Sequence, residues 1–534
     1  MFKPMKKSFT DTNEALLYFN SMSPDSSHYG EGQFNAGVIY QSNGNILKAI
    51  ECYENGIKCS YVKPEIFYNL AICYNKKGEE NKAIKCYIKA ISINPNFYDA
   101  KNNLYNILLK IGNELTEINK IDEAISFFLK NLSIAPDCKY LEALMVLARS
   151  YARKGDIYRS KRCIIKAVEL FPISPVPYLE LSIVKKFNPN DSNLINHIKY
   201  LYKNYSTDEN DEEMFCWALG KIYNDIGRYN QAFEYYKKAN SLFSKHIDSS
   251  LDKNIEFKDK MIKIFNKEFV SRIKRNGTGN KSRLPVFVAG HNRTGTSLIA
   301  TKLSMIEGIY SAGEVNYFNK FEKGYPDHVP YETRESIYKL SLEYLTILRK
   351  FSDDDSIIID KMPYNLKHIG WILTLFPDAK IILCKRHPLD ICLSNWFLKY
   401  ELNIGRDSNQ FSYDLITMAK YYKIVDCLIK HWLKLFKKNI FILHYENLIL
   451  NTEKIGKKLV SFLDMKWNSG FLNHQYSSTI TNTSSLWQVK QKLYKSSIYR
   501  WKNYEKNISE LISFLKKEII EYELELESYI LNIS

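Results

Sequence analysis

Residues 290–297, Gly-His-Asn-Arg-Thr-Gly-Thr-Ser, form a glycine-bounded segment that could bind an anion. It follows the apolar run 285–289 and precedes a helix-forming sequence, so we expect it to leave a β-strand and enter a helix. Such a loop offers backbone N–H groups and a helix N-terminus to an anion. It follows the outline G-x-x-x-x-G-K-[ST] of triphosphate-binding loops, but Thr296 stands in the place of the lysine. Arg293 is the only cation in the segment, so the expected ligand is an anion other than the triphosphate of ATP.

Three further polar clusters each follow a short apolar run in the same half of the chain. Apolar runs that alternate with helical segments predict a parallel sheet covered on both faces. Ligands of such sheets bind beyond the carboxyl ends of the strands, so we expect the clusters to meet around the loop. The clusters and their runs are Asp360-Lys361 after 357–359, Lys385-Arg386 after 380–384, and Tyr445-Glu446 after 440–444.

The elements that precede this half are repetitive. Gly44, Gly78 and Gly112 are 34 residues apart, and a small residue follows such a glycine by five, as at Ala49 and Ala83. This is the period of tetratricopeptide units, and the segment resembles an all-α solenoid of five units between about residues 29 and 243. The recurring glycines and alanines are expected where helices approach closely, and a displaced unit predicts a longer helix or loop at 113–120.

The concave surface of such an array implies a binding site. Its expected occupant is a peptide, a partner protein or a second copy of the chain in a homodimer.

Composition limits the class of protein. The net charge of +16 suits an anionic ligand, but the lysines are spread along the chain, which argues against nucleic acid as a partner. No run of 18 apolar residues predicts a membrane span, and the charged start lacks the apolar core of a secretory signal. The ten cysteines are scattered without a C-x-x-C pair, which indicates reduced core thiols and a cytoplasmic protein.

The sequence therefore predicts an α/β, P-loop-like parallel-sheet domain preceded by an all-α tetratricopeptide solenoid. The expected parts are a lead segment at 1–28, the repeat array at 29–250, a linker helix and basic hinge at 251–283, and the α/β domain at 284–534.

Residues 284–510 resemble the sulfotransferases that use 3′-phosphoadenosine-5′-phosphosulfate, and more closely the tyrosylprotein sulfotransferase branch. The resemblance rests on six motifs in the order of the family, although the family more often has proline at Asn292 and serine at Thr294. The motifs are 292–297, Gly313-Glu314, Asp360-Lys361-Met362-Pro363, Arg386 with Ser394 eight residues later, His444-Tyr445-Glu446, and Ser485-Leu486-Trp487 followed by Arg500-Trp501.

The resemblance implies how each motif acts. Glu314, 21 residues beyond Arg293, is the expected general base, because Pro363 stands where the small-molecule branch has its histidine. Lys361 and Arg293 would stabilise charge during transfer of the sulfuryl group to an acceptor hydroxyl, with protein tyrosine as the expected acceptor. The donor-binding residues implied are Arg293, Thr294, Gly295, Thr296 and Ser297 at the 5′-phosphosulfate, Arg386 and Ser394 at the 3′-phosphate, and Tyr445, Ser485 and Arg500 elsewhere on the nucleotide.

Simpler interpretations stay open at several of these positions. Arg293 can pair with a carboxylate, Arg386 with Asp390, and Glu314 with a nearby lysine. A kinase or ATPase is disfavoured because the loop lacks its lysine, and no acidic or histidine cluster predicts a metal requirement. Two further functions are compatible with the sequence: a carbohydrate or small-molecule sulfotransferase, and a tetratricopeptide scaffold whose nucleotide-binding domain is inactive.

Overall fold

The computed structural model describes residues 11–118, 120–245, 250–318, 326–354, 356–399, 410–476 and 495–531. The chain forms two compact units. The first takes in residues up to Lys154 together with Tyr158–Ala167, and the second takes in Gly155–Ile157 and the residues from Val168 onward. None of the helices in these ranges combines the length and the apolar character that crossing a bilayer requires.

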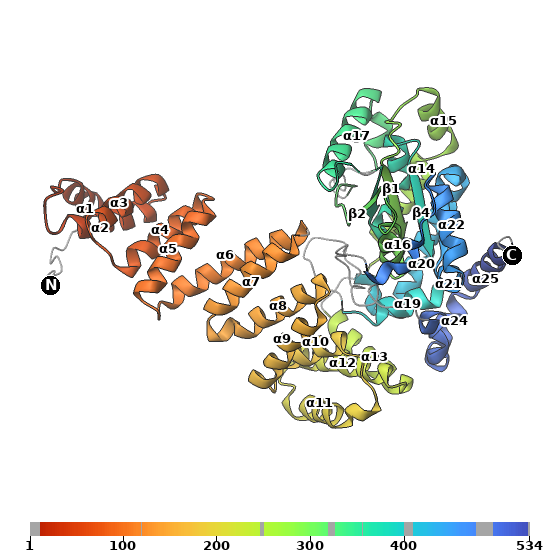
Figure 1. Ribbon diagram of the computed structural model, residues 1–534, viewed down its shortest axis with the longest axis horizontal. Helices are drawn as coiled ribbons and strands as arrows, with labels where there is room; N and C mark the ends of the chain where they lie inside the picture. The colour runs from red at the N-terminus through yellow and green to blue at the C-terminus, as the bar shows by residue number, and fades with distance from the viewer. Residues whose placement is uncertain are drawn as a thin grey trace. The chain divides into compact units, whose positions relative to one another are not determined.

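The first unit consists of helices that pack in successive pairs (Figure 1). α6 is the longest of them at 20 residues, which confirms the longer first helix expected around 113–120. The helices are α1 (Thr12–Asn20), α2 (Tyr29–Ser42), α3 (Ile46–Lys58), α4 (Pro64–Lys76), α5 (Glu80–Ile93), α6 (Tyr98–Glu117), α7 (Ile121–Ile134), α8 (Tyr140–Lys154) and α9 (Ile157–Leu170), the last of which continues into the second unit.

Two kinds of glycine recur in the array. Gly44 and Gly78 lie in turns with φ of 77° and 82°, and no atom lies within 4 Å of a Cβ built on either residue. They permit a left-handed turn and do not mark close helix contacts, so the expectation from the sequence was wrong for them. Gly112 does mark such a contact, because a Cβ there would lie 2.3 Å from the ring of Phe128. Ala49 and Ala83 are fully buried, as close packing requires.

The second unit opens with further helices of the array. They are α10 (Pro175–Val184), α11 (Ser192–Tyr205), α12 (Glu209–Asp225) and α13 (Tyr229–Ser244), and they are followed by α14 (Asp252–Ile264) and α15 (Lys267–Arg275). Asp208 caps α12 by accepting from the amide of Asp211 at 2.8 Å, which explains why acidic residues gather at the start of this helix.

A five-stranded, wholly parallel sheet follows, in the order β2-β3-β1-β4-β5, which confirms the predicted sheet. Because β1 lies between β3 and β4, the strand order reverses beside its carboxyl end, where ligands of such sheets bind. The edge strand β2 was not expected, since Ile-Tyr-Ser-Ala-Gly is not a continuous apolar run. The strands are β1 (Pro285–Gly290), β2 (Ile309–Gly313), β3 (Ile357–Lys361), β4 (Lys380–Lys385) and β5 (Ile440–His444).

Helices cover both faces of the sheet, so alternate residues of β1 enter two different cores. Val286 and Val288 pack against α16, α21 and α22, whereas the ring of Phe287 stacks on that of Tyr344 in α17, with centroids 5.9 Å apart. Every residue of β1 is therefore buried, which explains its apolar sequence. The helices of this domain are α16 (Thr296–Leu303), α17 (Arg334–Arg349), α18 (Ile369–Leu375), α19 (Pro388–Trp396), α20 (Leu415–Phe436), α21 (Tyr445–Leu450), α22 (Thr452–Phe462), α24 (Ser509–Phe514) and α25 (Lys516–Leu531).

All ten cysteines are unpaired, but only five of them are buried, so the expectation of core thiols was wrong for the exposed Cys59, Cys138 and Cys427. Two of the buried cysteines lie beside predicted phosphate-binding motifs: Cys384 on β4 and Cys392 on α19 are fully buried. Burial raises the pKa of both thiols well above the usual range.

Candidate active site

The loop after β1 turns sharply because two of its residues adopt a left-handed backbone. Arg293 has φ of 71° and Gly295 has φ of 89°. A Cβ on Gly295 would lie 2.7 Å from Cδ2 of Tyr445, so only glycine lets the loop pass this ring. Thr294 Oγ1 donates to the carbonyl of His291 at 2.7 Å and fixes the turn. α16 then starts with Thr296 and Ser297, both buried, whose amides have no acceptor inside the helix.

The structure joins this loop to the second predicted phosphate motif. Arg293 Nε donates to Ser394 Oγ of α19 at 3.0 Å, and Arg386 Nη1 donates to the carbonyl of Arg293 at 3.1 Å. Arg386 follows β4, which pairs with β1 so that Gly290 lies opposite Cys384. The pairing of β1 with β4 thus brings Arg293 to Arg386 and Ser394, which lie 93 and 101 positions later in the sequence.

Arg386 has several further contacts. Its guanidinium lies 4.7 Å from the ring centroid of Tyr445, and Nη2 donates to the carbonyl of Ser497 at 2.6 Å. Tyr445 Oη and Ser497 Oγ are 2.8 Å apart. Nη2 also lies 3.6 Å from Asp390 Oδ2, so the ion pair of the simpler interpretation is present. Burial raises the pKa of Asp390, and Arg386 opposes that shift.

Glu314 and Lys361 form an ion pair at the ends of β2 and β3. Lys361 is 2% exposed and Glu314 is 36% exposed, so the carboxylate is open to solvent while the ammonium is not. Burial lowers the pKa of Lys361, and the charge of Glu314 opposes this shift. The nearby lysine expected as a structural partner of Glu314 is therefore Lys361, the second predicted catalytic residue.

Asp360 fixes the geometry of this pair. It is fully buried, and its carboxylate accepts from the amide of Val315 at 3.3 Å, from Tyr344 Oη at 2.7 Å and from Asn365 Nδ2 at 2.9 Å. The carboxyl group of Asp360, next to Lys361, thereby also holds the backbone of Val315, the residue after Glu314. Burial raises the pKa of Asp360 to about 7, against the lowering effect of these hydrogen bonds.

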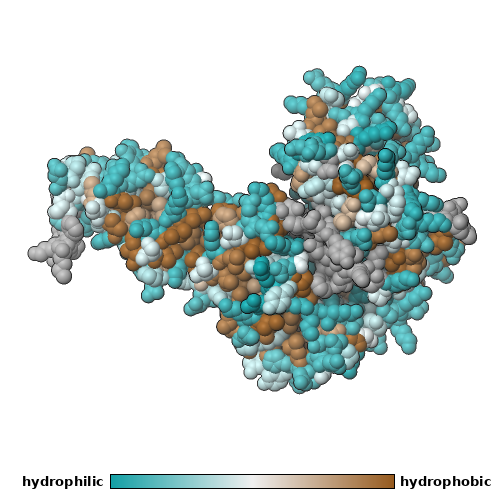
Figure 2. Space-filling view, in the orientation of Figure 1, coloured by the Kyte–Doolittle hydropathy of each residue, from teal (hydrophilic) through white to brown (hydrophobic). Residues whose placement is uncertain are grey.

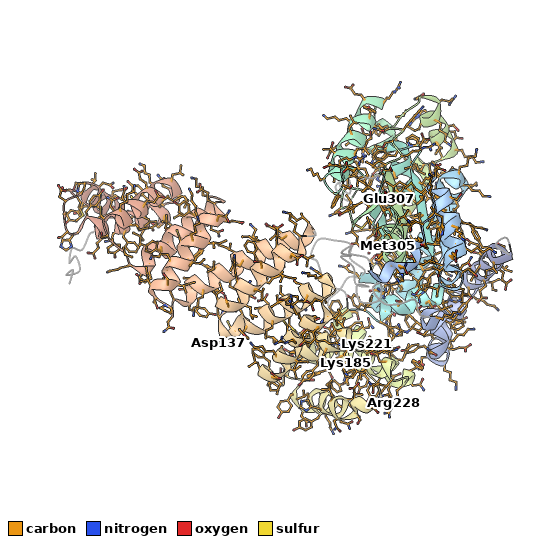
Figure 3. All side chains as sticks on the ribbon, viewed as in Figure 1. Asp137, Lys185, Lys221, Arg228, Met305 and Glu307 are labelled. Atoms are coloured by element: carbon orange, nitrogen blue, oxygen red, sulfur yellow. The ribbon has the colours of Figure 1, made fainter. Side chains whose placement is uncertain are left out.

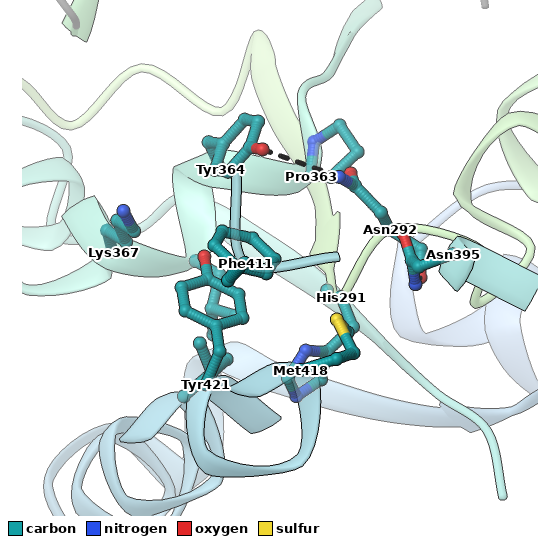
Figure 4. Close-up of a pocket in the computed structure, with 12 residues that line it drawn as sticks. His291, Asn292, Pro363, Tyr364, Lys367, Asn395, Phe411, Met418 and Tyr421 are labelled. Atoms are coloured by element: carbon teal, nitrogen blue, oxygen red, sulfur yellow. Dashed lines mark hydrogen bonds between the residues drawn. The ribbon is translucent and has the colours of Figure 1, made fainter. Parts of the chain in front are cut away.

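A pocket lies beside the loop, and aromatic side chains form much of its wall (Figure 4). The rings of Phe411 and Tyr421 stack with centroids 3.5 Å apart. Asn292 Nδ2 donates to Tyr364 Oη at 3.4 Å, and Lys367 Nζ lies 5.5 Å from the centroid of the Tyr364 ring. The lining of this pocket combines aromatic faces, amides and one ammonium.

Comparisons with known proteins match both halves of the chain. Residues 285–469 match the model of the sulfotransferase family. Tetratricopeptide-repeat models match residues 64–97 and, in a second model, residues 31–58, 141–173 and 215–246. The chain carries a sulfotransferase-family domain behind tetratricopeptide repeats.

The individual relatives are distant. An uncharacterized protein of Aquifex aeolicus is 26% identical over 393 residues, which cover 71% of this chain and 50% of that protein. Protein-tyrosine sulfotransferase 1 of Danio rerio is 26% identical over 210 residues, which cover 37% of this chain and 57% of that protein. The matched part thus spans about half the length of these curated relatives. The solved sulfotransferase domain of the Synechococcus PCC 7002 olefin synthase aligns over 42% of this chain and 89% of its own, with 18% identity and a TM-score of 0.32.

One predicted donor residue of the sulfotransferase domain, Arg500, has its side-chain hydrogen bond outside this cluster. The guanidinium of Arg500 donates to Asn224 Oδ1 at 2.6 Å. Trp501, next to it, stacks on the buried ring of His387, with centroids 5.3 Å apart. Ser485 lies outside the residues that the structure describes.

The sequence did not reveal Ser497, the aromatic wall of the pocket or the role of Asp360 as a tie. Ser497 contacts Arg386 through its backbone carbonyl, and any residue can supply that group. The pocket is assembled from segments as far apart as 290 and 425, so no local pattern announces it. The sequence offered one indication for Asp360, namely that a carboxyl group directly follows the three isoleucines 357–359.

Proposed function

We propose that the protein transfers a sulfuryl group from 3′-phosphoadenosine-5′-phosphosulfate to the hydroxyl of a protein tyrosine. The observation that supports this most strongly is the direct hydrogen bonding of Arg293, Ser394 and Arg386 at the carboxyl edge of the sheet. Two guanidinium groups thus lie beside a helix N-terminus, an arrangement suited to a ligand with two phosphate-type groups.

The residues present fit such a donor. Gly290 and Gly295 keep the loop free of side chains where it turns, and a Cβ on Gly290 would lie 2.4 Å from the carbonyl of Cys384. Arg293 and the first amides of α16 would hold the phosphosulfate, while Arg386 and Ser394 would hold the 3′-phosphate. The bound donor supplies a sulfuryl group that its bond to phosphate already activates.

Glu314 is the residue that we assign as general base. A phenol becomes more acidic as its oxygen bonds to sulfur, and a solvent-open carboxylate can then take its proton. Lys361 forms an ion pair with this carboxylate, and its ammonium adds positive charge at the end of β3. The carboxylate therefore accepts the proton, while the cations stabilise the departing phosphate oxygen.

Two observations favour tyrosine as the acceptor. The pocket beside the loop is lined by aromatic rings, and relatives of the domain include protein-tyrosine sulfotransferases of Danio rerio and Drosophila melanogaster. Pro363, which lines the pocket, stands where a histidine base would act on small phenols. A carbohydrate acceptor is the second candidate, because Asn292 and Asn395 supply amides that suit sugar hydroxyls.

The array is the proposed docking surface for a protein acceptor. Apolar surface is visible over its helices (Figure 2). Leu47, Ile88 and Ile118 are each more than half exposed and contribute to this surface.

The test has two arms. Calorimetry compares adenosine 3′,5′-bisphosphate with adenosine 5′-monophosphate, and we expect the bisphosphate to bind more tightly. Transfer from sulfur-labelled donor is then followed on tyrosine peptides, glycans and small phenols, with and without a chelator. Equal affinity for the two nucleotides would refute the donor. Labelling of a glycan but not of a peptide would identify a carbohydrate as the acceptor in place of tyrosine. Strict dependence on a divalent ion would favour a kinase-like reaction.

A further inference from the structure

The last repeat, formed by α12 and α13, is bonded directly to the sulfotransferase domain. Asn224, in the final turn of α12, accepts from Arg500 Nη2 at 2.6 Å and from Tyr504 Oη at 2.7 Å, both on one side-chain oxygen. Tyr504 is fully buried, and its ring lies 5.3 Å from that of Tyr229 at the start of α13. The segment 495–507 is thus held by the array at this point.

The same segment touches the predicted 3′-phosphate motif. The amide of Trp501 donates to Asp390 Oδ1 at 2.9 Å, and Asp390 Oδ2 lies 3.6 Å from Arg386 Nη2. Ser497, four residues before Trp501, accepts from the same Nη2 through its carbonyl. A continuous series of contacts therefore runs from Asn224, through residues 497–504, to the guanidinium of Arg386.

α13 supports the other half of the motif. Asn240 Nδ2 donates to the carbonyl of Trp396 at 3.0 Å, at the end of α19, the helix that carries Ser394. The rings of Phe233 and Trp396 lie 4.8 Å apart, and those of Tyr236 and Phe397 lie 4.6 Å apart. The repeat thus contacts the helix that carries Ser394 as well as the segment that contacts Arg386.

We propose that Asn224 is a positioning residue for the 3′-phosphate site, which makes the last tetratricopeptide unit a structural part of the donor site. This inference rests on the proposed donor. Asn224 holds Arg500 and Tyr504 by hydrogen bonds, which fixes the position of the Trp501 amide between them. That amide in turn holds the carboxylate of Asp390 beside Arg386. Lys221, one turn earlier in α12 (Figure 3), is paired with Asp225 at 2.6 Å. Asn224 takes no part in that ion pair, and its side-chain oxygen is bonded to Arg500 and Tyr504.

The sequence suggested another role for Arg500, namely direct contact with the nucleotide. The two roles predict opposite effects. If Arg500 binds the nucleotide directly, freeing it from Asn224 leaves the affinity unchanged or raises it. If Arg500 acts by holding residues 497–504, removal of Asn224 lowers the affinity.

The test uses the full chain and calorimetry with adenosine 3′,5′-bisphosphate and adenosine 5′-monophosphate. We expect Asn224→Ala to weaken binding of the bisphosphate about three- to tenfold, which is the effect of losing about one hydrogen bond. Binding of the monophosphate should be unchanged. Asn224→Asp keeps the acceptor oxygen and should match the parent. Asn210→Ala, at an exposed position in the first turn of the same helix, is the matched control.

Each result decides the proposal. A parent that prefers the bisphosphate, together with an unaffected Asn224→Ala variant, would overturn this inference and leave the proposed function standing. Equal weakening of both nucleotides would show a general structural effect and would overturn it as well. A parent that does not distinguish the nucleotides would overturn the donor itself. If Asn224→Ala is insoluble, Tyr504→Phe carries the same test, since it removes one of the two hydrogen bonds to Asn224.

Discussion

Glu314 is the residue on which the chemistry of the proposed reaction depends most. Its replacement by glutamine keeps the size of the side chain but removes the basic oxygen. We expect Glu314→Gln to bind adenosine 3′,5′-bisphosphate normally and to lose about 10²- to 10⁴-fold in turnover, with the acidic limb of the pH–rate profile gone. Steady-state kinetics with a tyrosine peptide, alongside calorimetry, measure both effects.

Glu307 provides the control for this variant. It is an exposed carboxylate seven residues earlier, just before β2 (Figure 3). Glu307→Gln should behave like the parent in both measurements. Near-normal turnover of Glu314→Gln would remove Glu314 as the base and would weaken the case for tyrosine.

Asp360 makes stability depend on pH in an unusual direction. Its pKa is about 7 in the folded protein against an ordinary value of 3.8, so the folded state holds this proton more tightly than the unfolded chain does. The stability that the proton contributes is complete below about pH 4 and is lost as pH rises through 7. Asn at this position cannot ionise. The melting temperature of Asp360→Asn minus that of the parent should therefore increase between pH 5 and pH 7.5, and a constant difference would contradict the assignment.

Among the elements, the loop between β1 and α16 is the most constrained. Gly295→Ala adds a Cβ where the φ is 89° and where Tyr445 lies 2.7 Å away. A left-handed backbone costs an alanine about 1–2 kcal/mol, and the contact forces Tyr445 to move. We expect a clear loss of nucleotide affinity by calorimetry.

Gly78→Ala separates the two effects. Gly78 has a similar φ of 82°, but open space surrounds it and it lies in the array. This variant should lower the melting temperature without changing nucleotide affinity. If both variants left the affinity unchanged, the contact between Gly295 and Tyr445 would be irrelevant to the site.

The elements also show what the sequence could and could not predict. Four strands were predictable because each contains an apolar run: β1, β3 and β4 lie inside the sheet, and β5 keeps apolar side chains although it is an edge strand. β2 was not, because Tyr310 and Ser311 interrupt its apolar residues. Arg293 and Arg386 were expected to lie close together because they follow the ends of β1 and β4, whereas Ser394, on α19, was expected only from the family resemblance. The partner of Arg500 was not, since Asn224 lies 276 residues away and no spacing rule links a repeat to a side chain so distant.

At the scale of the whole molecule, the division into compact units suggests where the chain can be cut. A fragment that begins at Val168 keeps α12 and α13, whereas one that begins at Lys281 uncovers Trp396, Phe397 and Tyr504, all nearly or fully buried. We expect the longer fragment to remain folded and to sulfate a small phenol, but to lose activity on a protein acceptor. We expect the shorter one to aggregate. Size-exclusion chromatography and transfer assays test both, and equal activity of the longer fragment and the full chain on protein would remove the array from acceptor binding.

The buried thiols of Cys384 and Cys392, on either side of Arg386 in the sequence, can be used to measure local opening of the fold. Only thiolates react with alkylating reagents, and Cys384 and Cys392 are kept protonated and enclosed, so they are labelled only when this part of the fold transiently opens. The exposed Cys59, Cys138 and Cys427 should react first, in a fast phase. Cys52, Cys73 and Cys216 are buried as well, so mass spectrometry must identify the alkylated residues, and the rate at Cys384 and Cys392 then measures how often the proposed donor site opens. A nucleotide that binds only the closed form lowers this alkylation rate as it occupies more of the protein. The dependence of the rate on nucleotide concentration therefore gives the affinity.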